Sequence, residues 1–209
     1  KKHREFKAEI LLTGQHRQLT DQAMKDFGLN AKYDLNLMKK GQGLEELSAR
    51  ILLKFGLILK RIKPDLVIAE GDTTTTAICS ICCYYQKIPF AHVEAGLRSF
   101  DKFQPFPEEI NRKISDVVAD LYFAPTKMAR MNLIKEGAPI KNIFVTGNTV
   151  IDSLHLLSGK KHKFNEQKLK NLDIGKPVIL VTAHRIESFG KPMNEIFQSL
   201  MELSKENVQ

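Results

Sequence analysis

The segment from residue 66 to residue 98, LVIAEGDTTTTAICSICCYYQKIPFAHVEAGLR, constrains the fold of this chain more than any other stretch. Two apolar runs rich in Val, Ile and Phe, Leu66–Ala69 and Ile88–Val93, are separated by a segment of about helical length. A strand, a crossover helix and a second strand have this pattern, because parallel neighbours need a long connection. We therefore predict a β-α-β unit and an α/β fold built on a parallel sheet.

Acidic residues follow both predicted strands. Glu70 and Asp72 close the first run and Glu94 closes the second, with glycines close by. The carboxyl ends of neighbouring parallel strands meet at one edge of a sheet, and ligands of open α/β sheets bind at that edge. We therefore expect these carboxylates to lie together.

The residues after the first strand indicate the start of a helix. Asp72 and four threonines, 73–76, precede the apolar Ala77-Ile78-Cys79, and Asp and Thr are common N-cap residues. A helix N-terminus presents free N–H groups to anions, so a carboxylate beside it favours acid–base chemistry on a phosphorylated substrate. The alternative is a capped crossover helix whose acids face solvent, and these residues by themselves favour neither interpretation.

Hydrophobic periodicity and turn residues predict the remaining elements. From Leu44 to Ile62, apolar residues recur at helical spacing, and Pro64 ends the pattern. Pro107 and the two glutamates after it suit the positive first turn of another helix. Further strands are expected at 8–13, 121–124, 143–146 and 177–182, further helices at 17–27, 126–135, 150–157 and 191–204, and an irregular connection at 33–43.

Composition places the chain among soluble globular proteins, since 43% of its 209 residues are hydrophobic and 27% are charged. No run approaches the roughly 20 apolar residues of a membrane span, and the first residues lack the apolar core of a signal peptide. We therefore expect a cytoplasmic protein without a membrane partner.

Charge and cysteine content limit the possible ligands. The formal net charge of +8 admits an anionic partner of nucleotide size, but no nucleic-acid motif accompanies it, so no nucleic-acid partner is expected. Cys79, Cys82 and Cys83 fall in one predicted helix, and no second Cys or His pair stands at a zinc-like spacing. Buried thiols are favoured over a metal site. The sequence has no GxGxxG and gives no signal for a redox cofactor.

Seven segments occur in the order and at the spacings of one enzyme family. The chain closely resembles the non-hydrolysing UDP-N-acetylglucosamine 2-epimerases, and the resemblance extends over nearly its whole length. The matching segments are LTGQHRQ (12–18), GDTTTT (71–76), HVEAGLRS (92–99), PFPEEINR (105–112), FAPT (123–126), VTGNTVID (145–152) and TAHRIESFG (182–190).

The resemblance implies a GT-B type architecture, in which two Rossmann-like domains face a cleft and each has a parallel sheet with helices on both faces. Relative to that pattern, an opening strand with a GTRPE-type loop and most of the second domain are missing from this chain. We therefore expect residues 1–157 to form the N-terminal domain without its first strand. Residues 158–176 are expected to connect the domains, and 177–209 to be the first β-α unit of a truncated second domain.

The activity implied by the resemblance is the interconversion of UDP-N-acetylglucosamine and UDP-N-acetylmannosamine for surface polysaccharide synthesis. The C2 hydrogen is not α to a carbonyl, so the family eliminates UDP across C1–C2 and adds it back on the other face. This requires a base, an acid and groups that hold the departing diphosphate, but no redox cofactor.

A homodimer is also implied, and the 209-residue piece is expected to be inactive by itself. The alternatives are a hydrolysing relative, a GT-B glycosyltransferase, and a non-catalytic module that binds a nucleotide or a protein.

The motif match also implies roles for individual residues. Asp72, Glu94 and Glu108 correspond to the catalytic carboxylates of the family, and His184 to a histidine at the substrate. Crowded carboxylates shift each other's pKa values apart, so that one serves as acid and another as base. Each residue has a structural alternative: a helix cap for Asp72, an ion pair with Arg98 for Glu94, a favourable first-turn charge for Glu108, and a surface position for His184.

The resemblance also implies residues that bind substrate or an activator and do not transfer protons. Arg98 and Arg185 are expected to bind substrate. Gln15, His16 and Gln18 match a segment that contacts an activating second UDP-N-acetylglucosamine in some bacterial members, and Arg185 could join them; a polar strand-to-helix loop is the interpretation that we favour slightly. The departures from the family pattern are Ile186 for the common arginine, Ser188 for asparagine and Phe106 for tryptophan.

Overall fold

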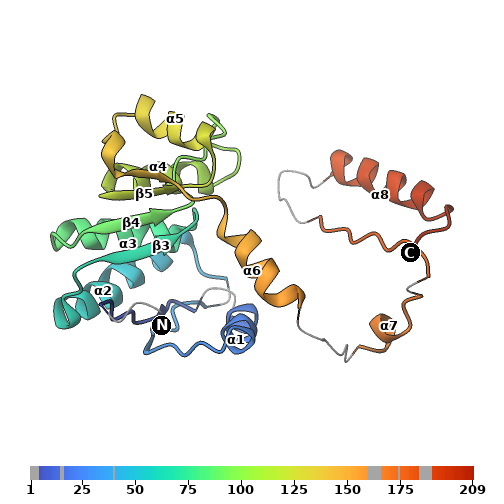
Figure 1. The fold of residues 1–209 in the computed structure, drawn as a ribbon, viewed down its shortest axis with the longest axis horizontal. Helices are drawn as coiled ribbons and strands as arrows, with labels where there is room; N and C mark the ends of the chain where they lie inside the picture. The colour runs from blue at the N-terminus through green and yellow to red at the C-terminus, as the bar shows by residue number, and fades with distance from the viewer. Residues whose placement is uncertain (1–4, 15–16, 40, 160–165, 174, 184–189) are drawn as a thin grey trace. The chain divides into compact units, whose positions relative to one another are not determined.

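The computed structural model describes residues 5–14, 17–39, 41–159, 166–173, 175–183 and 190–209. The chain divides into two compact units, residues 1–157 and 158–209, and each is described by itself (Figure 1).

The first unit is built on parallel strands. Its larger sheet contains β3 (Val67–Glu70), β4 (Phe90–Val93), β5 (Leu121–Ala124) and β6 (Ile143–Val145), hydrogen-bonded in that order. The predicted β-α-β unit is therefore present, and Glu70 pairs with Val93 at the end of the β3–β4 register.

A separate parallel pair lies near the start of the chain, where β1 (Leu11–Leu12) pairs with β2 (Tyr33–Asp34). The strand expected at 8–13 is thus much shorter than predicted. The connection expected at 33–43 is not wholly irregular, because its first two residues form β2. A strand of two residues is too short to produce the alternation of side chains by which strands are recognised.

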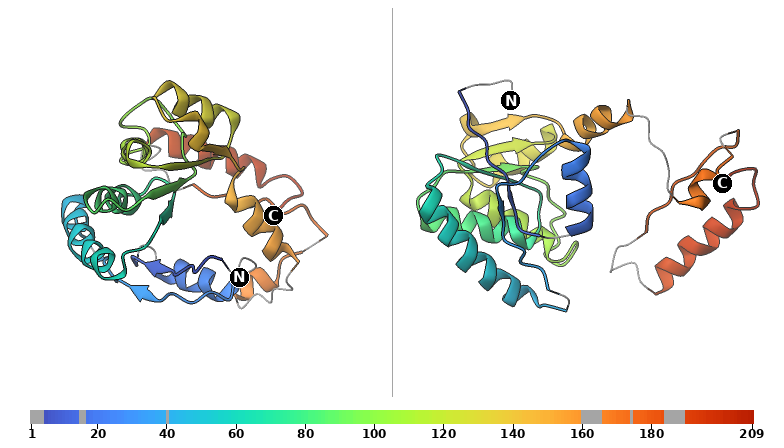
Figure 2. Two further views of the ribbon diagram at one scale, coloured as in Figure 1. Left: turned by 60° about the vertical axis from the view of Figure 1, so that its left-hand side comes forward. Right: turned by 90° about the horizontal axis from the view of Figure 1, so that it is seen from below.

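Helices connect the strands of the larger sheet in sequence. In the left view of Figure 2, α2 to α5 follow one another along one side of the strands. Successive right-handed crossovers that step in one direction across a sheet place their helices on the same face. The bounds are α1 (Arg17–Asp26), α2 (Leu44–Ile62), α3 (Thr74–Tyr85), α4 (Glu108–Val118), α5 (Lys127–Lys135), a 3-10 helix (Ile140–Asn142) and α6 (Thr149–Ser158).

The core lies between the sheet and these helices. Leu47, Ile51 and Phe55 of α2 are buried, as their helical spacing predicts. Helix α2 has the predicted bounds, and the N–H of Lys63, in the left-handed conformation, donates to the carbonyl of Leu59 at its end.

The three cysteines of α3 are free and buried. Burial away from water raises the pKa of Cys82 to about 11 and that of Cys83 to about 12. These thiols are therefore core residues and not nucleophiles.

The second unit contains α7 (Gln167–Lys170) and α8 (Lys191–Leu203). The strand predicted at 177–182 is not formed. Ile179 N–H donates to the Gln209 carbonyl and Gln209 N–H donates to the Pro177 carbonyl, but no ladder continues and Leu180 is 94% exposed. The described residues of this unit provide no strand with which the apolar run could pair, so the prediction was wrong. None of the described helices is both long and apolar enough to cross a lipid bilayer.

Candidate active site

The loops that follow β3 and β4 meet at the carboxyl edge of the sheet. Gly71 N–H donates to the carbonyl of Val93 at 3.1 Å, which joins the ends of the two strands. Oε2 of Glu94 lies 3.9 Å from the position that a Cβ on Gly71 would occupy. The Glu94 carboxylate therefore lies against the residue that immediately precedes Asp72.

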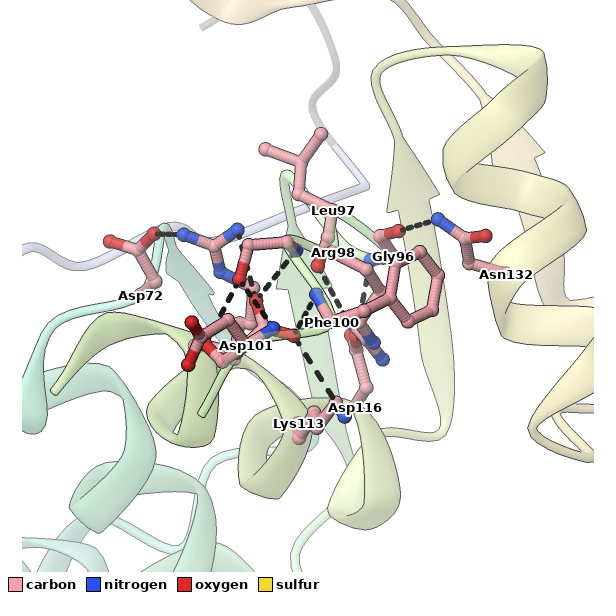
Figure 3. Close-up of polar contacts among 12 residues, drawn as sticks. Asp72, Gly96, Leu97, Arg98, Phe100, Asp101, Lys113, Asp116 and Asn132 are labelled. Carbon is pink, nitrogen blue, oxygen red and sulfur yellow. Dashed lines mark hydrogen bonds and ion pairs between the residues drawn. The ribbon is translucent and has the colours of Figure 1, made fainter. Parts of the chain in front are cut away.

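Asp72 does not cap helix α3. The N-cap is Thr73, whose hydroxyl accepts the N–H of Thr76 at 3.3 Å. The Asp72 carboxylate instead accepts from a guanidinium, with Nη2 of Arg112 at 2.5 Å from its Oδ2 (Figure 3). Asp72 is therefore not the helix cap that the structural alternative described. It forms an ion pair that joins the β3 loop to helix α4.

Glu94 stands in a strained backbone conformation with φ of 72°. Left-handed geometry at a non-glycine residue costs about 1 kcal/mol or more and is concentrated at functional sites. The N–H groups of Glu94 and Ala95 both donate to the Phe123 carbonyl, which holds the bend. Nδ2 of Asn148 donates to Glu94 Oε1 at 3.0 Å, so the side-chain partner is this amide and not Arg98.

Glu108 lies in the first turn of α4, and the environment of one of its carboxylate oxygens is unusual for a buried polar atom. Its Oε2 is buried and has no hydrogen-bond partner among the described residues. Buried polar atoms are rarely left unpaired in folded proteins, and exceptions are candidates for function. Glu108 also lines a cavity of about 180 Å³ together with Thr73, Thr74 and Asn111.

Arg112 connects the helix that carries Glu108 with the loop that carries Asp72. Glu108 and Arg112 are one helical turn apart and share a face of α4. Since Arg112 contacts Asp72, and Glu94 lies against Gly71, the segments that carry the three predicted carboxylates meet at the carboxyl edge of the sheet.

Glu70 adds a fourth carboxyl group to this edge. Partial desolvation, followed by repulsion from Glu94 and Asp72, raises the pKa of Glu70 above its usual value, and the His92 ring opposes the shift. The Glu70 carboxyl group therefore belongs to the same acidic edge as Glu94 and Asp72.

The neighbouring Glu109 has a structural role. Its side chain is fully buried, and its two oxygens accept the N–H groups of Ser99 at 3.0 Å and Phe100 at 3.2 Å. It therefore fixes the loop that enters α4.

The geometry of Arg98 does not fit the expected role in substrate binding. Its guanidinium side chain is 0% exposed and contacts Asp116 at 2.7 Å, with further bonds to Glu136 and to the Leu97 carbonyl. These contacts occupy four of the five N–H groups of the guanidinium, and the side chain is enclosed, so Arg98 has a structural role here.

Four of the predicted residues lie outside the described part of the chain, namely His184, Arg185, Gln15 and His16. Gln18 is described and is exposed in the first turn of α1. Phe106, which replaces the family's common tryptophan, is 60% exposed.

Sequence reasoning did not single out Arg112, Asn148, His92 or Asp116. Arg112, Asn148 and His92 fall inside the segments PFPEEINR, VTGNTVID and HVEAGLRS, so the motifs contained the signal. Asp116 lies outside every quoted segment, and its pairing with His92 across 24 residues is visible only in three dimensions.

The fold and the site define a Rossmann-like α/β protein of the GT-B type, present in part, with carboxylates gathered where its parallel strands end. A family profile described as UDP-N-acetylglucosamine 2-epimerase matches residues 1–209. The chain belongs to this family.

Individual relatives agree with the family match. A UDP-N-acetylglucosamine 2-epimerase of Salmonella typhimurium is 45% identical over 208 residues, which cover 97% of this chain and 55% of the relative. The Neisseria meningitidis 2-epimerase in a crystal structure bound to UDP-GlcNAc is 39% identical with a TM-score of 0.89, covering 98% and 56% of the two chains. The Methanocaldococcus jannaschii enzyme, in complex with UDP-GlcNAc and UDP, is 30% identical with a TM-score of 0.79, covering 98% and 57%. The chain spans about half the length of the relatives that it matches.

Proposed function

We propose that this chain contributes the acid–base residues of an enzyme that interconverts UDP-N-acetylglucosamine and UDP-N-acetylmannosamine by elimination and re-addition of UDP. Membership of the family supports this activity, and solved relatives contain UDP-GlcNAc or UDP. The observation that carries the proposal is the gathering of Asp72, Glu94 and Glu108 from three separate segments. Arg112 joins the Asp72 loop to the Glu108 helix, and Glu94 lies against Gly71.

The proposed chemistry needs one group to remove the C2 hydrogen and another to return a proton to C2 on the opposite face. Carboxyl groups crowded in one site acquire different proton affinities, which lets two of the three divide these roles. Among the described residues, Oε2 of Glu108 has no hydrogen-bond partner, and the hydrogen bond that Glu94 accepts from Asn148 is at Oε1, so the Oε2 atoms of both residues are candidates for contact with the ligand. The positive N-terminal ends of α3 and α4 favour the departing diphosphate at the same edge.

The test is hydrogen exchange at C2 of the sugar in deuterated water, followed by proton NMR in the full-length protein. Glu94→Gln should lower the exchange rate by about 100-fold or more, because it removes a proton-transfer group without changing side-chain size. Glu45→Gln, at an exposed position of α2, is the matched control and should exchange like the wild type. Wild-type exchange in a folded Glu94→Gln protein would remove Glu94 from the mechanism.

The same spectra identify the reaction by its product. Reversible formation of UDP-N-acetylmannosamine is expected. Free N-acetylmannosamine with UDP would indicate a hydrolysing enzyme instead, and transfer to an acceptor would indicate a glycosyltransferase.

Further sequence-based expectations enter as proposals. We propose that His184 acts at the substrate diphosphate or helps in proton transfer, that Arg185 binds substrate, and that Gln15, His16 and Gln18 belong to an activator site. We also propose residues 1–157 as the first domain, 158–176 as a connection and 177–209 as the start of the second. The cytoplasmic location and the role in surface polysaccharide synthesis remain predictions.

We propose a homodimer as the assembled state. Gln86 Nε2 donates to the Gly56 carbonyl at 2.8 Å and holds α2 and α3 together. The outer positions of this helix pair carry Leu53, Leu57, Tyr84 and Tyr85, which are 67% to 72% exposed. Large apolar side chains that recur on one helix pair are typical of a surface that another subunit covers.

A further inference from the structure

A buried histidine and a buried aspartate lie beneath the two loops that carry Asp72 and Glu94. His92, in β4, and Asp116, in the third turn of α4, have side chains that are 0% and 3% exposed. Nδ1 of His92 is 2.6 Å from Oδ1 of Asp116. Because both side chains are enclosed, any influence on a substrate must pass through the groups that they hold.

The second ring nitrogen of His92 holds the β3 loop. Nε2 is 2.8 Å from the carbonyl oxygen of Gly71. A carbonyl only accepts hydrogen bonds, so Nε2 carries a proton and donates it. The N–H of Gly71 is bound to Val93, and the φ of this glycine is 81°. His92 therefore fixes the peptide from which Asp72 emerges.

The second oxygen of Asp116 holds the β4 loop. Its Oδ2 accepts from Gly96 N–H at 3.1 Å and from Nη2 of Arg98 at 2.7 Å. Figure 3 shows Gly96 between this carboxylate and Asn132, whose Nδ2 donates to the Gly96 carbonyl at 3.0 Å. Gly96 follows Glu94 by two residues, so Asp116 binds the β4 loop directly and the β3 loop through His92.

The donors around the pair also indicate where its protons lie. Oδ2 of Asp116 receives two hydrogen bonds, one of them from a cation, and this favours the carboxylate form. The 2.6 Å contact at Oδ1 then requires a proton on Nδ1, in addition to the one on Nε2. Charges of alternating sign follow one another from His92 through Asp116 and Arg98 to Glu136. The first three of these side chains are buried, and removing one partner of a buried ion pair is strongly destabilising.

We propose that His92 and Asp116 form a positioning pair, which sets the spacing between Asp72 and Glu94 and through it the rate of proton transfer. The proposal rests on the proposed function, because Asp72 and Glu94 are the groups that it positions. A misplacement of about 1 Å by a residue away from the chemistry can cost about 100-fold in rate.

Two substitutions of His92 separate its two bonds in the full-length protein. The amide nitrogen of Asn occupies nearly the place of Nδ1, so His92→Asn keeps a donor toward Asp116 and loses the bond to Gly71. The longer Gln reaches the place of Nε2, so His92→Gln keeps the donor toward Gly71. His155→Asn, at an exposed position of α6, is the control.

We expect His92→Asn to lower kcat by about 10- to 100-fold with KM within twofold of the wild type, since the groups that bind substrate are unchanged. His92→Gln should retain at least tenfold more kcat than His92→Asn. Wild-type kcat in His92→Asn would overturn the proposal. Equal losses in both variants, in proportion to their losses of melting temperature, would also overturn it, because they would indicate a purely structural role.

A second measurement does not depend on activity. The ¹⁵N spectrum of labelled histidine should show that His92 carries a proton on both ring nitrogens at neutral pH. An unprotonated His92 nitrogen would overturn the pair even if the enzyme were active. A wild-type protein without epimerase activity would instead contradict the proposed function, and the two failures are therefore distinguishable.

Discussion

At the scale of single residues, adjacent side chains divide the work between structure and chemistry. Thr73 caps helix α3, and this leaves the neighbouring Asp72 carboxylate available to Arg112. Glu109 similarly binds the loop backbone, while an oxygen of Glu108 has no partner in the part of the chain that the structure describes. The sequence could identify the acids but not this division, since Asp and Thr are both common N-cap residues and local preference does not select Thr73 over Asp72. Pairings across 40 residues for Asp72 and 54 for Glu94 leave no local pattern in a sequence.

Glu70 should affect stability in a pH-dependent way. Its raised pKa means that the folded state binds the proton more tightly than the unfolded state. This group's contribution to stability is therefore fully present below the unfolded pKa and is lost as pH rises through the raised folded pKa. Glu70→Gln should raise the melting temperature at pH 7 by about 1–3 °C, because the solvent-exposed side chain is partly screened. The gain should vanish near pH 3, where the acid is protonated in both states. A gain of equal size at both pH values, measured by calorimetry, would contradict the repulsion.

At the scale of elements, the accuracy of prediction follows the length of the pattern. Helix α2 has the predicted bounds because five turns of apolar periodicity and a closing proline agree. The strand β2 was missed because it is two residues long. The strand predicted at 177–182 was wrong although the segment is an apolar run. A strand must pair with a second strand, and the local sequence does not show whether one is present.

The turn after β4 packs against α5 so closely that only glycine fits at Gly96. A Cβ there would lie 2.3 Å from the Ala129 carbonyl oxygen, and the φ is 84°. Gly137 has a similar φ of 92° with nothing within 4 Å of its Cβ position. Gly96→Ala should therefore lower the free energy of unfolding by about 3 kcal/mol or more, and the matched control Gly137→Ala by about 1–2 kcal/mol. Urea denaturation measures both, and equal losses would show that the contact with α5 can relax.

At the scale of the whole molecule, several large apolar side chains of the described residues remain exposed to solvent in a single copy of the chain. The outer face of the α2–α3 pair carries two leucines and two tyrosines, all more than 65% exposed. Motif spacing predicted the fold class, which the sheet and the structural relatives confirm. It could not locate this surface, because apolar residues at helical spacing are read as core until the partners of each helix are known.

Charge placed on the α2–α3 surface should separate the proposed dimer. Leu57→Asp and Tyr85→Asp should each convert the protein to a monomer in sedimentation velocity at micromolar concentration, since an unpaired charge in an apolar interface loses its hydration. Met128→Asp, at a position of α5 that is 69% exposed, is the control and should remain dimeric. Dimers that survive both α2–α3 substitutions would assign the contact to another face.

Because Glu94 has a left-handed backbone conformation, thermal stability and catalysis favour different residues at this position. Glycine there would remove the torsional cost and raise the melting temperature, but it would also remove the carboxylate. Laboratory selection for heat resistance without an activity screen should therefore enrich glycine at residue 94, and its products would be robust but inert.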